Sequence, residues 1–250
     1  MKSACMCASF AVAVVCLLVP TARSGGLSED YQPLEVGSHW EYNSAVLGEM
    51  SMSIVGDQDI LGVTTRVRRQ VQQDQVFENF WSEDASGNVY LHGAVNFTYP
   101  AEAAYVPPIR MVAPPLFLGK SWVTNDIRVY NLDGTPWDDA PIDYPLRVYT
   151  EGTITVPAGD FYSYGVGYDT PFGSLLTSRQ GTFDVLGRRV AGSQSTTDNA
   201  TEWYSDGVGV VQSCYYTDRQ YAFRLLSYGL PTVPTQATTW GRVKALYGSD

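Results

Sequence analysis

The chain has 250 residues and a formal net charge of −10 at pH 7, because 26 acidic residues outnumber 16 basic ones. Nucleic-acid binding needs a clustered positive surface, so this charge excludes nucleic acid as an expected partner. Tyr (17), Gly (23), Pro (14) and Trp (6) are abundant. We find no convincing helical period before the last ten residues, and the composition therefore favours a mainly β protein.

Residues 1–24 have the pattern of a cleaved secretory signal peptide. Lys2 supplies a positive start, residues 10–19 form an apolar run, and Ala22-Arg23-Ser24 is a small-x-small site before Gly25. The run is shorter than the roughly 20 apolar residues that a membrane span needs. We expect a secreted or periplasmic protein with no transmembrane segment after signal removal; the alternative is an uncleaved N-terminal anchor.

Three of the four cysteines lie in this signal, so Cys214 alone remains and no intramolecular disulfide is expected. Cys214 belongs to an expected strand, where a free cysteine usually behaves as a small buried hydrophobe. A nucleophile or an intermolecular disulfide is the alternative.

A single β domain is expected over residues 25–228, beginning with a polar lead. Trp40 and Tyr42 share one face of its first strand. Turns are expected at 56–59 and 84–88, and cationic residues of the strand at 63–71 should face solvent and blunt a sheet edge. The strands of this first part form a meander of antiparallel hairpins: 33–42, 49–55, 63–71, 76–81 and 89–92.

Prolines interrupt this pattern at residues 96–118, where we expect a long ordered loop or a crossing between two halves of the sheet. The segment 115–122 then repeats the Pro-Leu-x-x-Gly-x-x-Trp spacing of residues 33–40. The repeat indicates either an internal duplication or a convenient way to start a strand twice. We favour the second interpretation, because little else aligns between the halves.

The clearest signal in the second part is at residues 202–211, where a tight turn at Asp206-Gly207 joins two strands. Gly207 suits such a turn because glycine takes positive φ at no steric cost. The other strands expected in this part are 122–130, 147–156, 161–168, 182–190, 212–216 and 221–228.

Residues 229–239 form a Thr/Pro linker, and residues 240–250 form a short amphipathic tail. Apolar residues from Trp240 to Tyr247 recur at helical spacing. Eight residues do not hold a helix alone in water, so this tail should dock on the sheet or on a cell-envelope partner.

No residue is assigned a catalytic, cofactor-binding or metal-ligating role. His39 and His92 are the only histidines, and each has no second histidine at ligand spacing, whereas zinc needs three or four converging ligands. The Gly-x-Ser-x-Gly signature of serine hydrolases is absent. We expect both histidines to be ordinary strand residues.

The acidic loop at residues 133–143 is the one alternative source of chemistry. Asp133, Asp138, Asp139 and Asp143 cluster there, and such carboxylates can hold calcium or serve hydrolysis. A solvated loop is the favoured interpretation. The triplets Asn96-Phe97-Thr98 and Asn199-Ala200-Thr201 fit the glycosylation pattern.

Three motifs occur in order: a Pro-Leu-x-x-Gly-x-x-Trp-x-Tyr opening at 33–42, Val-Pro-Ala-Gly-x-Phe at 156–161, and Trp-Tyr-x-x-Gly-Val-Gly at 203–209. Together they resemble a broad group of uncharacterised bacterial secreted β-proteins. The resemblance implies a curved antiparallel sheet or an open β-barrel, like those of bacterial lipoprotein carriers, and it carries over no catalytic residues. Asp206 stands where many of these proteins have Pro.

These observations predict a non-enzymatic protein that binds an apolar or glycan ligand, or a cell-envelope partner, in the concavity of its sheet. The alternative is a secreted hydrolase of polysaccharide or peptide that uses the loop at 133–143.

If residues 1–24 are a cleaved signal, the mature protein begins at Gly25. Expression in a secreting bacterial host, followed by intact mass measurement and N-terminal sequencing, checks this. A chain that keeps Met1 and stays in the membrane fraction would instead indicate the uncleaved anchor.

Overall fold

The structure is a computed structural model that describes residues 29–98, 101–137, 140–168, 176–178, 181–183, 201–214 and 222–231. The predicted signal at 1–24 and the tail at 240–250 lie outside the described residues, as does most of the linker at 229–239. A docking role for Trp240 to Tyr247 therefore stays a prediction. Within the described ranges, no helix is long and apolar enough to cross a bilayer.

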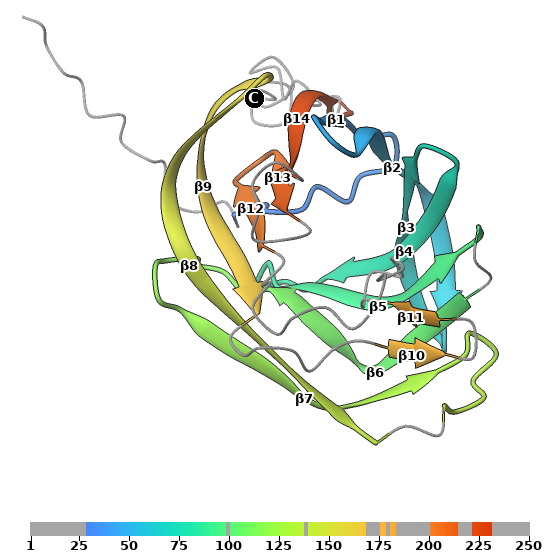
Figure 1. Ribbon diagram of the computed structural model, residues 1–250. Coiled ribbons are helices and arrows are strands. Elements are labelled where there is room, and N and C mark those ends of the chain that lie inside the picture. The colour runs from blue at the N-terminus through green and yellow to red at the C-terminus, as the bar shows by residue number, and fades with distance from the viewer. Residues whose placement is uncertain are drawn as a thin grey trace, which may run out of the picture.

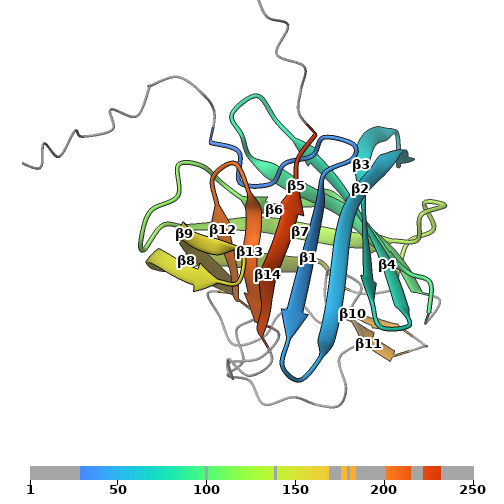
Figure 2. The same cartoon turned by 90° about the horizontal axis from the view of Figure 1, so that it is seen from above.

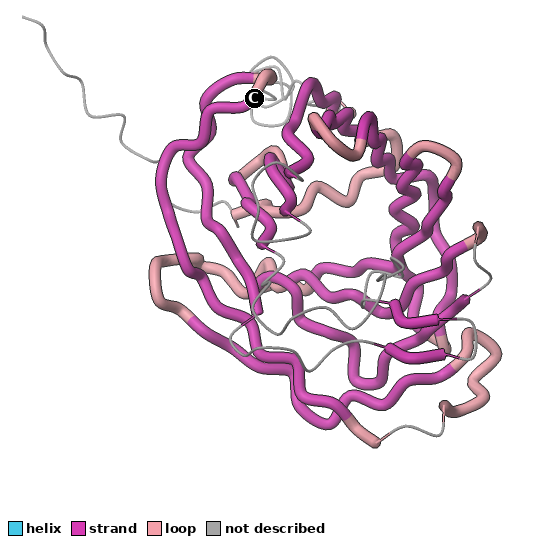
Figure 3. The backbone as a smooth tube through the Cα atoms, viewed as in Figure 1, coloured by secondary structure: helices cyan, strands magenta, loops and turns pink. Residues whose placement is uncertain are grey.

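Twelve antiparallel strands form a closed barrel (Figures 1 and 3). Around the ring they follow the chain, except that β10 (Leu176–Ser178) and β11 (Gly181–Phe183) form a separate small sheet. The barrel strands are β1 (His39–Ser44), β2 (Gly48–Ile60), β3 (Val63–Gln72), β4 (Gln75–Glu83), β5 (Val89–Asn96), β6 (Ala101–Val112), β7 (Ser121–Tyr130), β8 (Ile142–Val156), β9 (Gly159–Tyr168), β12 (Thr201–Ser205), β13 (Gly209–Cys214) and β14 (Ala222–Gly229).

The antiparallel β prediction is confirmed, but the sheet does not stay open. β1 pairs with β2 on one side and with β14 on the other, so that Trp40 faces both Met52 and Tyr228 in register. Closure leaves no unpaired edge among the barrel strands. The prediction that β3 is a sheet edge is wrong, because β3 lies between β2 and β4. Of its cationic residues, Arg69 is exposed as predicted, whereas Arg68 is buried.

Two segments predicted as irregular are strands. β2 runs through residues 56–59 to Ile60, because a register shift after Ile54 absorbs the irregularity. The turn follows at Leu61-Gly62, where both residues have positive φ (49° and 85°), as a two-residue hairpin requires.

The predicted loop at 96–118 contains β6, despite its prolines. Pro107 and Pro108 lie where β5 and β6 shift register between Leu91 and Gly93, and β6 pairs with β7 only over Ala104–Val106. Proline lacks an N–H and is tolerated in sheets at such irregular positions.

The buried apolar residues of the described chain form three clusters, of which two are large and the third is a small group around Phe80. Around β1 and β2, Trp40 and Tyr42 pack with methionines, and both also donate hydrogen bonds to backbone carbonyls of the β13 side, Val208 O (2.6 Å) and Val210 O (2.8 Å). A second, larger cluster reaches from Trp81 on β4 to the β7 and β8 side. The wall is thus closed and much of its interior is packed.

The segment before β1 crosses one end of the barrel (Figures 1 and 2). At one end of the segment, Gly207 N–H donates to Asp30 O and Asp30 N–H donates to the Asp206 carboxylate. At the other end, Gly37 N–H donates to Ile54 O of β2. The segment therefore connects the β12–β13 turn to β2 across the mouth of the barrel.

The two Pro-Leu-x-x-Gly-x-x-Trp segments share a turn at their glycine, although the peptide bond before Pro115 is cis and the one before Pro33 is not. Gly37 (φ 97°) and Gly119 (φ 85°) both have positive φ, and each donates its N–H to the long strand beside it, to Ile54 O and Val148 O respectively. The strands that they introduce, β1 and β7, stand six positions apart in the twelve-stranded ring.

The likeness of the halves continues strand by strand. The β2–β3 register shifts after Ile54, and the β8–β9 register shifts after Val148. The next hairpins do the same, β4–β5 after Phe80 and β12–β13 after Trp203. The strands β1 to β6 and the strands β7, β8, β9, β12, β13 and β14 share one six-strand plan, which favours the internal duplication. The predicted hairpin at residues 202–211 is β12–β13 and forms part of this plan.

Gly93→Ala tests the close approach of β5 and β6. A Cβ at Gly93 would overlap the carbonyl oxygen of Ala103, a backbone atom of the paired strand, so the substitution should destabilise the fold by about 1–3 kcal/mol. Chemical denaturation measures this loss. Gly56→Ala is the matched control, because a Cβ there meets no atom within 4 Å; equal effects of the two substitutions would contradict the assigned packing.

Candidate functional site

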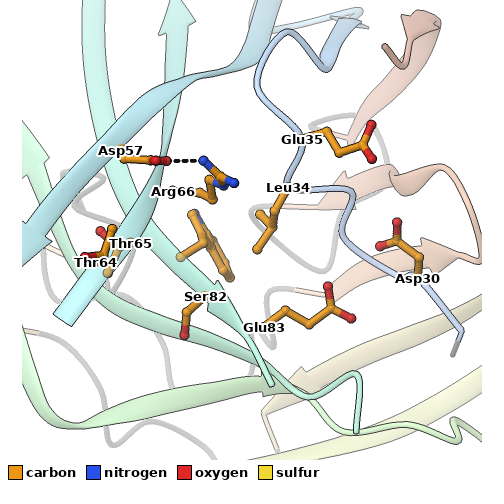
Figure 4. A pocket seen from close by; sticks show the side chains of 10 residues that line it. Asp30, Leu34, Glu35, Asp57, Thr64, Thr65, Arg66, Ser82 and Glu83 are labelled. Atoms are coloured by element: carbon orange, nitrogen blue, oxygen red, sulfur yellow. Dashed lines mark hydrogen bonds and ion pairs between the residues drawn. The ribbon is translucent and has the colours of Figure 1, made fainter. Parts of the chain in front are cut away.

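A pocket of about 470 Å³ lies under the segment that crosses the barrel mouth. Its lining comes from three separate parts of the chain: this segment, the β2–β3 hairpin and the end of β4 (Figure 4). The lining residues are Asp30, Leu34, Glu35, Asp57, Thr64, Thr65, Arg66, Trp81, Ser82 and Glu83. Only Leu34 and Trp81 are apolar or aromatic, so this is a polar pocket with four carboxylates and one cation.

Three of the carboxylates lie on one side of the pocket, those of Asp30, Glu35 and Glu83 (Figure 4). Burial raises the pKa of the Asp30 carboxyl, the N–H of Gln32 lowers it, and the negative charges of Asp206 and Glu35 raise it further. Loss of solvent around the Glu83 carboxyl raises its pKa, and the charge of Asp30 adds to this. Negative charges therefore repel one another here.

The fourth carboxylate, Asp57, is neutralised on the opposite side of the pocket. It accepts a hydrogen bond from Arg66 across the β2–β3 hairpin, and the two form an ion pair (Figure 4). Among the described residues this is the one ion pair in the pocket, so Asp30, Glu35 and Glu83 have no salt-bridge partner there.

Trp81 is almost fully buried (1% exposed), and the guanidinium of Arg68 lies 4.4 Å from its ring centre. Arg68 donates to the amide oxygens of Gln32 and Asn79 (both 3.4 Å). The indole Nε1 of Trp81 has no hydrogen-bond partner in the described part of the chain. A buried N–H without an acceptor is uncommon in folded proteins, and here it belongs to a residue that lines a pocket.

The turn after β4 holds Glu83 in place. Asp84, the next residue, accepts hydrogen bonds from the backbone N–H groups of Ser86 and Asn88, from the Asn88 amide and from the Tyr90 hydroxyl. These bonds keep the pKa of Asp84 below its ordinary value, the Asn88 amide contributing most. The turn predicted at 84–88 is confirmed and fixes one wall of the pocket.

The second half of the barrel carries larger side chains at the equivalent positions. The strand register makes Tyr164 the counterpart of Arg66 and Tyr162 the counterpart of Thr64. Tyr162 and Tyr164 pack edge to face with ring centres 5.6 Å apart, and Tyr31 packs against Tyr164 at 5.9 Å. The pocket thus lies where the first half has Thr and Arg in place of two tyrosines.

The two histidines lie apart. His92 is buried, its Nε2 is 2.7 Å from Ser82 Oγ, and burial lowers the pKa of its imidazole. A serine and a histidine in contact could begin a nucleophilic dyad, but in the described residues no carboxylate orients His92, as a triad requires. His39 is exposed at the start of β1.

The acidic loop does not form a site in the described residues. Asp133 accepts the N–H of Thr135, and Asp143 accepts the N–H of Asp126, whereas Asp138 and Asp139 lie outside the described ranges. No group of three His, Cys, Asp or Glu residues in the described chain is close enough to hold a metal ion.

The remaining candidates are buried or only partly described. Cys214 is buried. Asn96 is fully buried, and its side-chain oxygen accepts the N–H of Thr98, so it is closed to a glycosylating enzyme in the folded protein. Of the second triplet, Asn199 lies outside the described residues.

Sequence reasoning did not single out any of the pocket residues as a site. Their positions are far apart in sequence, and only the long β2–β3 pairing and the crossing segment bring them together. One signal was present: residues 80–84 (Phe-Trp-Ser-Glu-Asp) resemble residues 203–206 (Trp-Tyr-Ser-Asp), which would have linked Glu83 to Asp206.

Glu83→Gln is expected to raise the temperature of unfolding at pH 7. A carboxyl whose pKa is raised in the folded state favours folding below the ordinary Glu value of 4.5 and loses that contribution as pH rises through the raised value. The gain should therefore disappear at about pH 3, where both states are protonated. Calorimetry at both pH values checks this, with the exposed Glu41→Gln as control; a gain at acid pH only would contradict it.

No protein-family model matches this chain, and no curated protein matches it. Two solved structures resemble it in fold. A Bacteroides fragilis protein with a YmcC-like fold, described as a candidate exported protein, is 13% identical, with a TM-score of 0.42 over 81% of this chain and all of the other. A candidate lipoprotein from Parabacteroides distasonis is also 13% identical, with a TM-score of 0.32 over 82% of this chain and all of the other. A likeness this weak bears on neither the ligand nor the location of this protein.

Proposed function

We propose that the protein is a secreted or periplasmic binding protein without catalytic activity, and that it holds a small polar ligand, such as a glycan fragment, in the pocket under residues 30–35. The observation that carries this proposal is the pocket itself. Its volume of about 470 Å³ falls within the range of roughly 300–1,000 Å³ that is usual for small-molecule sites.

The character of the lining favours a glycan over an apolar ligand. Eight of the ten lining residues are polar or charged, and they include hydroxyl, guanidinium and carboxylate groups that pair with sugar hydroxyls. An apolar ligand would shield these groups from water without offering them hydrogen bonds, which is unfavourable.

The secreted or periplasmic location is supported by the signal pattern of residues 1–24. The proposed absence of catalysis is supported by the contacts of the candidate catalytic groups. Asp133 and Asp143 are engaged with backbone N–H groups, and His92 contacts Ser82 without an orienting carboxylate in the described residues.

Thr64→Trp tests the proposal by filling the pocket. Thr64 is an exposed residue at its rim, so an indole there should occupy the cavity and weaken ligand binding at least about tenfold, or 1.4 kcal/mol. The measurement is nuclear magnetic resonance titration of the labelled protein with cellobiose, N,N′-diacetylchitobiose, the fully deacetylated chitobiose and digalacturonate.

Gln58→Trp is the matched control. Gln58 is exposed on the same hairpin and pairs with Thr65, but it does not line the pocket. At least one disaccharide should shift the resonances of pocket residues in the wild type and in Gln58→Trp. The proposal is wrong if no disaccharide does so, or if Thr64→Trp binds as well as the control.

A further inference from the structure

We propose that the ligand of this pocket is an amino sugar, whose protonated amino group is held by Glu83 and Asp30. This inference rests on the proposed function and narrows it to one chemical class. Because the two halves of the barrel share one strand plan, each pocket residue can be compared with the residue at the equivalent position in the other half.

Glu83 is a hydrogen-bond acceptor without a donor. Its counterpart in the second half is Asp206, since both stand two residues after the equivalent aromatics Trp81 and Tyr204. Asp206 accepts the backbone N–H of Asp30 at 2.9 Å. Glu83 is exposed, and within the described residues no hydrogen bond or ion pair reaches its carboxylate, so the place that a protein N–H takes in one half is open to solvent or to a ligand in the other.

The same comparison holds for the second carboxylate of the hairpin. Asp57 of β2 corresponds to Glu151 of β8, because each faces the residue that pairs with the equivalent aromatic. Glu151 accepts the N–H of Leu118 at 3.0 Å, whereas Asp57 is bound by Arg66. Arg66 therefore pairs with Asp57, while the carboxylate of Glu83, like that of Glu35, has no hydrogen-bond or ion-pair partner among the described residues.

The lining of the pocket carries more negative than positive charge. With Asp57 and Arg66 paired, the lining still carries Asp30, Glu35 and Glu83 and no further cation. Arg68 lies behind the ring of Trp81, where it bonds to amide oxygens. An ammonium group between Glu83 and Asp30 would relieve this repulsion, and charge-assisted hydrogen bonds of this kind are the strong ones.

A metal ion does not fit this arrangement. The carboxylates surround a space and do not converge on a point, because no group of three His, Cys, Asp or Glu residues in the described chain is close enough to hold a metal ion. A cation held by Glu83 and Asp30 together therefore fits better as the ammonium group of a larger molecule than as a bare metal ion.

The donors of the pocket require that this cation also carries oxygen atoms. Trp81 has a buried indole N–H without an acceptor in the described chain, and the guanidinium of Arg66 has five N–H groups, of which Asp57 cannot use all. Hydroxyl or ring oxygens of a ligand would accept from Arg66, whereas the indole N–H of Trp81 is fully buried. Among the glycans of the proposed function, amino sugars carry both an amino group and such oxygens, and a cavity of about 470 Å³ accommodates one or two sugar rings.

The test compares fully deacetylated chitobiose with N,N′-diacetylchitobiose by isothermal titration calorimetry at pH 6. The two disaccharides share one skeleton, and acetylation removes only the positive charge and its donors. The free amine should bind the wild type at least about tenfold more tightly, and Glu83→Gln should lower its affinity about tenfold. Glu41→Gln, which removes the same charge from an exposed site on β1, should leave the affinity unchanged.

The outcomes separate this inference from the proposed function. If diacetylchitobiose, cellobiose or digalacturonate binds as tightly as the amine, and Thr64→Trp blocks it, the amino-sugar inference is wrong and the binding function stands. If the amine binds equally well to Glu83→Gln, the assigned carboxylate is wrong. If no disaccharide binds, both proposals fail.

Discussion

The fold depends on the pairing of β1 with two strands that come from opposite ends of the domain. β1 lies between β2, its neighbour in sequence, and β14, which is the last strand of the described chain. This pairing removes the sheet edges, and the chain before β1 lies across the mouth of the barrel. Asp30 and Leu34 reach the pocket only because the segment is anchored at both ends, on Asp206 and on Ile54. The pocket is a consequence of closure.

The two halves of the barrel share one strand plan, but only the first half has the pocket. The difference comes from the side chains at equivalent positions. Tyr162 and Tyr164 pack with Tyr31 in the second half, whereas the first half has Thr64 and Arg66 at the equivalent positions. The strand order is the same in both halves, and so are the register shifts after Ile54 and after Val148. The wall of the pocket keeps this plan and differs by its smaller and charged side chains, and a preformed wall favours binding.

Local sequence signals predicted the local structure well and the closure poorly. Alternation of apolar residues predicted β1 and β2, and the Asp206-Gly207 turn predicted the β12–β13 hairpin. The position of β6 was missed because its prolines sit at a register shift that only the pairing with β5 reveals. The site was missed for the same reason: Asp30 and Glu83 are neighbours through long-range pairing, and a carboxylate on an exposed turn looks like any solvated acid. Burial of Arg68 could not be foreseen because β3 was taken for an edge.

The electrostatics of the pocket link binding to folding. The raised pKa values of Asp30 and Glu83 mean that their ionised forms oppose the folded state at neutral pH. The Asp57–Arg66 ion pair neutralises only the carboxylate on the opposite side of the pocket, so the repulsion between Asp30 and Glu83 remains. A cationic ligand that binds the folded chain alone adds stability that grows with the logarithm of its concentration, and it removes a repulsion that the protein itself leaves in place. The segment across the barrel mouth brings these carboxylates together. Their mutual repulsion lowers the stability of the unliganded protein, and the same carboxylates bind the cationic ligand.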